Sequence, residues 1–170
     1  MENTCDEAAF HDFVVARLSA FSRTAYLLTG DHHLAEDLVQ TALFKTAKAW
    51  HRIEGSPEAY VRRILYTQNV SWWRSRRQVL ERPLEAYDDR ASDAEDHELR
   101  MSLTQALAQL TAKQRTVLVL RYYEDLTEAE TARVLGIGVG TVKSQSRQAL
   151  ARLRVVAPHL GELIRTEASR

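Results

Sequence analysis

The sequence predicts an all-α fold made of two small helical domains. Apolar residues recur at helical spacing along most of the chain, and no alternating run rich in valine and isoleucine suggests a strand. Only three prolines and six glycines interrupt this pattern. An acidic stretch over residues 83–96 lacks a sustained apolar period, so we expect it to form a flexible linker between the domains.

Two helices are expected at the start of the chain. The first carries an apolar face and ends at Gly30, and the second begins after Asp31. The apolar face of the first consists of Phe10, Phe13, Val14, Leu18, Phe21, Ala25 and Leu28. The common side of the second consists of Leu34, Leu38, Ala42, Lys45 and Ala49.

A third helix is expected from Pro57 to about Val79. Ser56 can act as its N-cap, and proline is favoured at the first helical position. Adjacent residues on a helix are turned by about 100°, so Trp72 and Trp73 cannot point the same way. We expect one of the two tryptophans to anchor the core and the other to lie at the surface.

Beyond the acidic stretch the helical pattern returns at Glu98. Thr111 and Gln114 have the spacing of a capping box, which opens a helix reaching Tyr122. The apolar positions before the capping box are Leu99, Leu103, Ala106, Leu107 and Leu110. The residues that we expect this helix to carry are Val117, Leu118, Leu120, Arg121 and Tyr122.

Residues 126–154 have the build of a helix-turn-helix, a module whose second helix enters the DNA major groove. Thr127 and Glu130 form a second capping box, and Gly136 stands where a left-handed C-terminal cap is required. The residues expected to face inward from the second helix are Val139, Val142, Ser146, Ala149, Leu150 and Leu153. The other side carries Thr141, Ser144, Gln145 and Gln148, flanked by Lys143, Arg147, Arg152 and Arg154. Since no acidic residue occurs between Val139 and Ala157, this helix suits a phosphate backbone.

Charge is arranged in blocks although the net charge is zero. Residues 51–80 carry six arginines against Glu54 and Glu58, and residues 81–98 carry eight acidic residues against two arginines. Such asymmetry indicates separate surfaces for separate partners. Tyr66, Trp72 and Trp73 lie among the arginines, a composition typical of a surface on which unpaired bases stack.

The chain is expected to be soluble and cytoplasmic. Its one cysteine, Cys5, fits a reducing compartment, and there is no long apolar run to insert into a membrane.

A metal-dependent nuclease or hydrolase is an alternative class. Its metal site would be assembled from His32, His33, Asp37, Asp88 and Asp89. Adjacent histidines do not readily serve one ion, however, and neither metal-binding nor phosphate-cradling motifs occur. We therefore expect no catalytic residue, metal or cofactor.

Several motifs taken together resemble a known family. The segments are GDHHLAEDLVQTAL, PEAYVRRIL, SWWRSRR, and VGTVKS following LTEAETARVLG. They are similar to group 4, or extracytoplasmic-function, sigma factors of bacterial RNA polymerase. Within that group they are similar to the SigE-like family of actinobacteria. The resemblance implies sigma region 2 over residues 8–80, an acidic linker over 81–97, region 4 over 98–157 and a tail over 158–170.

The resemblance also implies partners and residue roles. Expected partners are core RNA polymerase, through the clamp helices of its largest subunit and its flap region, promoter DNA and an anti-sigma factor. The residues implied to dock on the polymerase are Glu36, Asp37 and Gln40. Those implied to read the −10 element and hold the opened strand are Arg62, Arg63, Thr67, Asn69, Trp72, Trp73, Arg74, Arg76 and Arg77. Those implied to read the −35 element are Thr141, Lys143, Ser144, Gln145, Arg147, Gln148 and Arg152.

Two departures from the family pattern are visible. Thr67 stands where family members carry asparagine, with Asn69 two residues later, which leaves the fine readout of the −10 element open. Family recognition helices are richer in arginine where Gln145 and Gln148 stand, and have leucine where Ser146 stands. Fewer phosphate contacts and a weaker helix core should give the isolated chain only modest affinity for duplex DNA.

A stand-alone helix-turn-helix regulator is the principal alternative. It accounts for residues 126–154 equally well, because that argument does not involve the polymerase. It leaves the AEDLVQ motif and the tryptophan–arginine helix unexplained.

Overall fold

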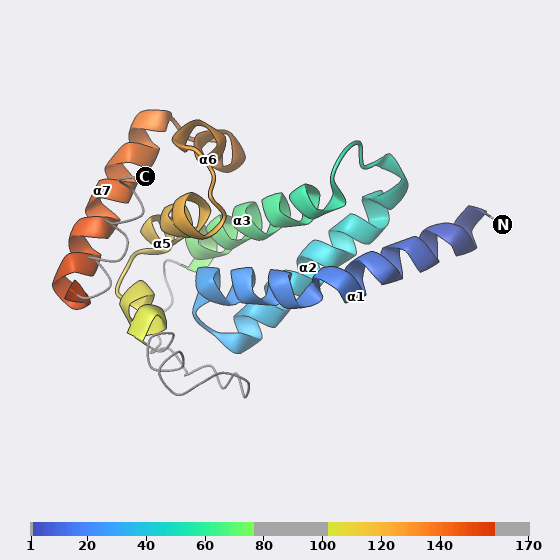
Figure 1. The fold of residues 1–170 in the computed structure, drawn as a ribbon, viewed down its shortest axis with the longest axis horizontal. Helices are drawn as coiled ribbons and strands as arrows, with labels where there is room; N and C mark the ends of the chain where they lie inside the picture. The colour runs from blue at the N-terminus through green and yellow to red at the C-terminus, as the bar shows by residue number, and fades with distance from the viewer. Residues whose placement is uncertain (1, 77–101, 159–170) are drawn as a thin grey trace.

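Every regular element that the computed structural model describes is helical, within the described residues 2–76 and 102–158 (Figure 1). The elements are α1 (Glu2–Thr29), α2 (His32–Ala49), the 3-10 turn η1 (Trp50–Arg52), α3 (Pro57–Arg76), a short helix over residues 102–108, α5 (Ala112–Leu118), the π-helical turn η2 (Val119–Tyr123), α6 (Glu128–Leu135) and α7 (Val139–Val156). The all-α prediction is confirmed. The expected linker, the end of the third helix and the tail beyond Pro158 lie outside the described residues.

The N-terminal bundle consists of α1, α2, η1 and α3. Gly30 adopts φ 69° and reverses the chain after α1, and the Asp31 side chain caps α2 by accepting a hydrogen bond from Leu34 N at 2.9 Å. At the start of α3, Ser56 Oγ accepts from Ala59 N at 3.3 Å. The predicted starts of the second and third helices are therefore confirmed.

Two residues placed on buried faces by the periodicity prove to be exposed. Leu18 is 42% exposed, because it lies on a strip of α1 that its neighbours leave uncovered. Lys45 is exposed on α2, where its Nζ donates to Gln68 Oε1 of α3 at 2.6 Å. A long polar side chain thus bridges the two helices at a position that the pattern assigned to apolar packing.

The C-terminal unit consists of residues 102–108, α5, η2, α6 and α7. Both predicted capping boxes are formed, at Thr111 with Gln114 and at Thr127 with Glu130. Gly136 ends α6 in the left-handed conformation, with φ 64°, as its position predicts. The inward face of α7 is formed by Val142, Ser146, Ala149 and Leu153, with Leu150 half-buried.

Val139 was also expected to face inward, and this prediction is wrong. The side chain is 41% exposed, because it opens the first turn of α7, before the helix is covered by its neighbours. Val142 instead anchors this end of α7. It is completely buried and packs in one cluster with Val117 and Ala132.

The helix expected to reach Tyr122 divides after Leu118. The chain widens into the π-helical turn η2, in which Glu124 N donates to Val119 O at 2.9 Å across five residues. Asp125 then adopts a left-handed conformation with φ 53°, a region in which aspartate is one of the better tolerated residues. Single π-turns often occur at functional sites, and this one sets the direction of the Glu124 side chain.

The N-terminal bundle and the C-terminal unit pack against each other. One apolar cluster joins Phe21, Leu28 and Leu65 of the bundle to Val119 and Leu120 of η2. Figure 1 shows α5 against the ends of α1 and α3, and α7 on the outer side of the C-terminal unit. The structure therefore brings together segments that are far apart in the sequence.

Arg115 fixes this packing from the centre. Its guanidinium donates to Leu28 O at 3.3 Å and to Thr29 O at 3.0 Å, the carbonyls at the C-terminal end of α1. It also donates to Leu107 O and Leu110 O of its own unit. Burial lowers the pKa of Arg115 to about 10, so the side chain remains charged at neutral pH. A cation is favourable at this site because the end of a helix carries partial negative charge.

Replacing Arg115 by methionine is expected to lower the free energy of unfolding by about 3 kcal/mol, because buried carbonyls of both units lose their donor. The measurement is chemical denaturation followed by circular dichroism. Lys113→Met is the matched control, since Lys113 is exposed on the same helix and should change stability by no more than about 0.5 kcal/mol. An unchanged denaturation midpoint for Arg115→Met would contradict this role.

Candidate nucleic-acid interface

The outer face of α7 carries the residues predicted to contact the −35 element. Gln145 is half-buried there, and the other residues predicted to contact the −35 element are exposed. These exposed residues are Thr141, Lys143, Ser144, Arg147, Gln148 and Arg152. The face is open to a partner along its whole length, and its charged side chains are all cationic.

Local contacts hold parts of this face in place. Lys143 Nζ lies 3.7 Å from a Glu128 carboxylate oxygen on α6, an exposed pair that water screens strongly. Gln148 Nε2 donates to Ser144 Oγ at 3.4 Å, and Gln114 Nε2 of α5 donates to Gln148 Oε1 at 3.5 Å. These long, exposed hydrogen bonds can be exchanged for contacts to DNA at low cost.

Ser146 lies on the opposite, inward side of α7. It is 8% exposed, and its hydroxyl has no hydrogen-bond partner in the described protein. A short polar side chain at this position fills less space than leucine and contributes no apolar contact. The packing agrees with the expectation that Ser146 weakens the core beneath the recognition helix.

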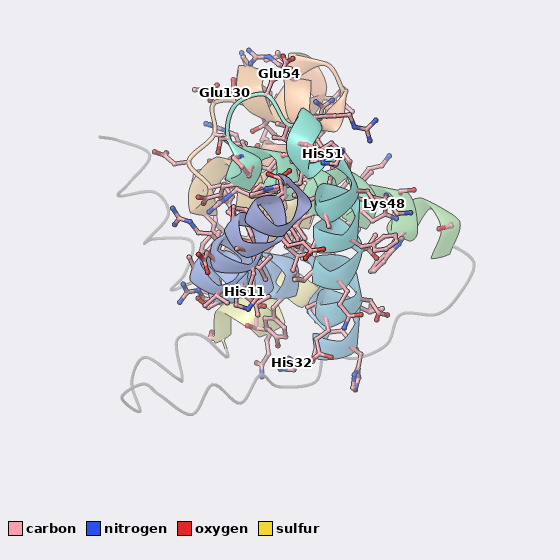
Figure 2. All side chains as sticks on the ribbon, turned by 90° about the vertical axis from the view of Figure 1, so that its right-hand side faces the viewer. His11, His32, Lys48, His51, Glu54 and Glu130 are labelled. Carbon is pink, nitrogen blue, oxygen red and sulfur yellow. The ribbon has the colours of Figure 1, made fainter. Side chains whose placement is uncertain are left out.

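The start of α6 is stabilised by the second capping box. Thr127 N donates to Glu130 Oε2 at 2.8 Å and Glu130 N donates to Thr127 Oγ1 at 3.1 Å. Hydrogen bonds from the backbone and hydroxyl of Thr127 lower the pKa of the Glu130 carboxyl, which lies on the outside of α6 in Figure 2. A lowered pKa means that the contribution of Glu130 to stability is present above its unfolded pKa and is lost on acidification.

The residues predicted to read the −10 element are in different environments along α3. Arg63 and Thr67 are exposed, and Arg62 and Trp72 are half-buried, with Trp72 packed against the apolar cluster. Asn69 is completely buried. Trp72 therefore has the role of core anchor that one of the two tryptophans was expected to have.

For the remaining −10 candidates less is described. The backbone of α3 reaches residue 76, and the side chains at 73, 74 and 76 lie outside the description. Residue 77 lies beyond the described part of the helix altogether. The roles of Trp73, Arg74, Arg76 and Arg77 stay predictions.

Arg62 is the centre of an ion-pair network that joins three parts of the chain. Its Nη2 lies 2.8 Å from Glu58 Oε1, and Glu58 also pairs with Arg17 of α1 at 3.2 Å. On its other side Arg62 pairs with Glu124, which follows η2 in the C-terminal unit. Glu124 also accepts from Thr24 Oγ1 of α1 at 2.8 Å.

The Asn69 amide is held across the same boundary. Its Nδ2 donates to Thr116 Oγ1 of α5 at 3.0 Å, and Thr116 in turn donates to Ala112 O. Beside it, burial raises the pKa of the Tyr66 phenol well above its ordinary value, so this side chain stays neutral. Sequence patterns did not identify Glu124 or Thr116, because each lies far from its partner along the chain.

The residues predicted to dock on the polymerase lie together on the outside of α2. Glu36, Asp37 and Gln40 are exposed, while Leu38 and Ala42 on the opposite side are buried. One turn beyond Gln40 the face continues into an exposed phenylalanine, Phe44, which is 62% exposed with Lys48 Nζ 4.4 Å from its ring centre. Gln40, Thr41, Leu43 and Phe44 line an open hollow there.

The described histidines come from three separate places, with His32 and His33 adjacent at the start of α2. Figure 2 shows His11 on α1, His32 at the start of α2 and His51 in η1 well apart from one another. Among the described residues, no group of three or more histidine, cysteine or carboxylate side chains is arranged to hold a metal ion. His32 packs on the Tyr26 ring, with 5.0 Å between ring centres. Within the described residues 2–76 and 102–158, no helix is long and apolar enough to cross a membrane.

Comparison with known proteins identifies the class. Residues 13–79 match the family described as Sigma-70 region 2, and residues 100–153 match that described as Sigma-70, region 4. The chain is 41% identical over 149 residues to the RNA polymerase sigma-E factor of Streptomyces coelicolor, which covers 85% of this chain and 84% of that protein. It is 33% identical over 153 residues to the ECF RNA polymerase sigma factor SigL of Mycobacterium tuberculosis, covering 82% and 83%.

Solved structures show the same fold. The sigma factor RpoE in complex with the anti-sigma factor NepR from Bartonella quintana superposes with a TM-score of 0.67 at 24% identity, over 89% of this chain and 98% of that one. CnrH in complex with the cytosolic domain of CnrY gives 0.60 at 21% identity, over 88% of each chain.

The two matched regions define a helical protein of the sigma-70 class. The chain belongs to the family of RNA polymerase sigma factors, within the extracytoplasmic-function group and of the sigma-E type. The resemblance noted in the sequence is thereby confirmed. Region 2 accounts for the motifs of α2 and α3, which a stand-alone regulator leaves unexplained.

Arg147 is predicted to contact the phosphate backbone next to the −35 element. Arg147→Ala is expected to weaken binding to −35 duplexes of any sequence and to reduce the slope of log affinity against log salt by about 1. Fluorescence anisotropy over a salt series measures both quantities. Arg23→Ala is the matched control, because Arg23 is also exposed but lies on α1. An unchanged salt slope in Arg147→Ala would remove this residue from the interface.

Proposed function

We propose that this protein acts in the cytoplasm as a promoter-reading subunit that binds core RNA polymerase and directs it to a specific set of promoters. Residues 98–157 would read the −35 element and residues 8–80 would dock on the polymerase and read the −10 element. The linker over residues 81–97 would connect the two regions. Membership of the sigma-70 family supports this function, and the open, cationic face of α7 is the structural observation on which it rests.

Reading of the −35 element would use α7 as the recognition helix in the major groove. Lys143 and Arg147 can bind phosphate or guanine, and Gln148 can form a bidentate pair with adenine. Because Gly140 has no side chain and its surroundings are open, the backbone there can approach a phosphate closely. Sequence discrimination would then come from a few base contacts, with the arginines setting the register.

Reading of the −10 element would use α3. Opening a duplex costs unstacking and unpairing energy, which aromatic stacking and cationic contacts to the displaced strand can offset. The tryptophan–arginine segment of α3 combines both residue types. No covalent bond needs to be made or broken in this work, so we propose that the chain is not itself an enzyme and that nucleotide chemistry belongs to the polymerase.

Docking on the polymerase would use the exposed side of α2. Glu36 and Asp37 present carboxylates near the N-terminal end of that helix, which suits a basic partner surface. Gln40 and the exposed ring of Phe44 extend the face by two turns. An anti-sigma factor is a further proposed partner, since the neighbouring sigma factor RpoE was solved in complex with the anti-sigma factor NepR.

Run-off transcription tests the function directly. Core RNA polymerase is incubated with and without the protein on a pool of upstream regions from the source genome. New discrete transcripts whose promoters share −35 and −10 sequences are the expected result. Absence of transcripts, together with intact duplex binding and no association with core enzyme, would favour a stand-alone regulator.

Asp37→Asn is expected to weaken association with core polymerase by about tenfold, because a desolvated charge pair across an interface is worth at least 1.4 kcal/mol. Co-sedimentation or fluorescence titration with core enzyme measures the affinity. Asp6→Asn removes the same charge from an exposed position on α1 and should bind as the wild type does. Equal affinity of the two variants would show that this carboxylate does not face the polymerase.

A further inference from the structure

Three cationic residues follow one side of α2 and η1. Lys45, Lys48 and Arg52 are separated by three and then four residues, which is the spacing of neighbours on a helix surface. All three are exposed, and among the residues that the structure describes none of them forms an ion pair. We call these three residues the α2 basic edge.

The basic edge adjoins α3. Lys45 Nζ donates to Gln68 Oε1 at 2.6 Å, and Gln68 follows directly on Thr67, an exposed residue predicted to read the −10 element. Thr67 lies on a stripe of α3 that runs from Tyr60 to Ser71 at helical spacing. The Lys45–Gln68 hydrogen bond therefore joins the basic edge and this stripe into one continuous surface.

Each cation of the edge is held by a neutral group. The amide oxygen of Gln68 holds Lys45, and the Phe44 ring lies 4.4 Å from Lys48 Nζ, which Figure 2 shows on the outer side of α2. Arg52 Nη2 donates to Lys48 O at 3.3 Å, at the C-terminal end of α2, where a cation is favourable. These contacts restrict the side chains and leave their positive charge available to an anion.

Acidic residues are absent from the two stretches of sequence that form this surface. None occurs in residues 38–53, which contain the basic edge, or in residues 59–76 of α3. Glu58, at the start of α3, is engaged by Arg17 of α1 and by Arg62, at 3.2 and 2.8 Å. A surface of this composition attracts a polyanion, because no neighbouring carboxylate opposes it.

We propose that the α2 basic edge binds backbone phosphates of the displaced non-template strand, so that this strand passes from α3 onto α2. The inference rests on the proposed reading of the −10 element by α3. A single strand is favoured over a duplex because Tyr60, 36% exposed, lies on the adjoining stripe. Exposed aromatic rings beside cations are typical of surfaces that bind single strands.

This assignment gives α2 two working sides. Glu36, Asp37 and Gln40 would face the polymerase, and the basic edge would face DNA. Phosphates carry no base identity, so Lys45 and Lys48 would hold the opened strand in register and contribute nothing to sequence preference. Sequence reading would remain with α3.

The test uses holoenzyme assembled from core polymerase and full-length protein, as wild type, Lys45→Gln, Lys48→Gln and the double variant. Lys113→Gln is the matched control, because it removes the same charge from an exposed lysine of α5. Lys45→Arg keeps the charge. The probes are a single-stranded oligonucleotide with the −10 sequence of a promoter identified by run-off transcription, and a −35 duplex from that promoter. Fluorescence anisotropy over a salt series gives affinity and salt slope.

Each single glutamine variant is expected to reduce the slope of log affinity for the −10 strand against log salt by about 0.7, and the double variant by about 1.4, because one phosphate contact is lost per lysine. At 0.1 M salt this corresponds to about fivefold weaker binding per lysine. Lys45→Arg and Lys113→Gln should bind the −10 strand as the wild type does. All variants should bind core enzyme and the −35 duplex equally.

A neutral backbone separates a direct contact from a general effect of charge. Methylphosphonate groups replace the phosphates of the −10 strand one at a time. Neutralising the phosphate that Lys45 contacts should weaken binding by the wild type and leave binding by Lys45→Gln unchanged. Equal weakening of both proteins at every position would overturn the contact.

An unchanged salt slope in the double variant would also overturn the inference. Weaker association of that variant with core enzyme would overturn it by assigning the basic edge to the polymerase, and an equal loss on the −35 duplex would do so by showing a general charge effect. Failure of the proposed function gives a different result, since wild-type holoenzyme would then produce no transcripts. Transcripts with an unchanged slope would reject only the role of the basic edge.

Discussion

The arrangement of the whole molecule depends on one buried guanidinium. Arg115 donates to carbonyls of α1 and to carbonyls of its own unit, so it links two regions that a linker alone would leave independent. The charge is tolerated in the interior because each of the three guanidinium nitrogens donates to a backbone carbonyl. The placement of Arg115 also brings Val119 and Leu120 against the N-terminal bundle, because α5, which carries Arg115, leads directly into the turn η2 that contains them.

The helix ends and turns could be predicted from the sequence because their causes are local. Thr111 with Gln114 and Thr127 with Glu130 form the capping boxes that their spacing predicts, and Gly30 and Gly136 adopt the left-handed conformation that their positions require. Periodicity also identified most buried faces. It failed at Leu18 and Val139, where the helix is regular but no neighbouring element covers the residue. Periodicity shows which side of a helix is apolar and does not show how far its partner extends.

The contacts that set the relation between the two units could not be predicted in this way. Thr24 and Glu124 are separated by 100 residues, and Asn69 and Thr116 by 47, so no local pattern connects them. From the sequence alone, these threonine, asparagine and glutamate residues are expected at the surface, because polar side chains are usually exposed. The π-helical turn was equally hidden, because its sequence continues the helical pattern of α5. The candidate −35 face could be predicted from the composition of one helix, whereas the partners of Arg62 and Asn69 are apparent only in the tertiary structure.

The packing of Val119 and Leu120 in the bundle has a consequence for the lifetime of the protein in a cell. Both side chains are almost completely buried, in a cluster that the two units share. Any opened chain therefore uncovers apolar surface that was dry, and such surface is what chaperones, proteases and other unfolded chains bind. We expect a chain whose two units separate to be a better protease substrate than the packed chain.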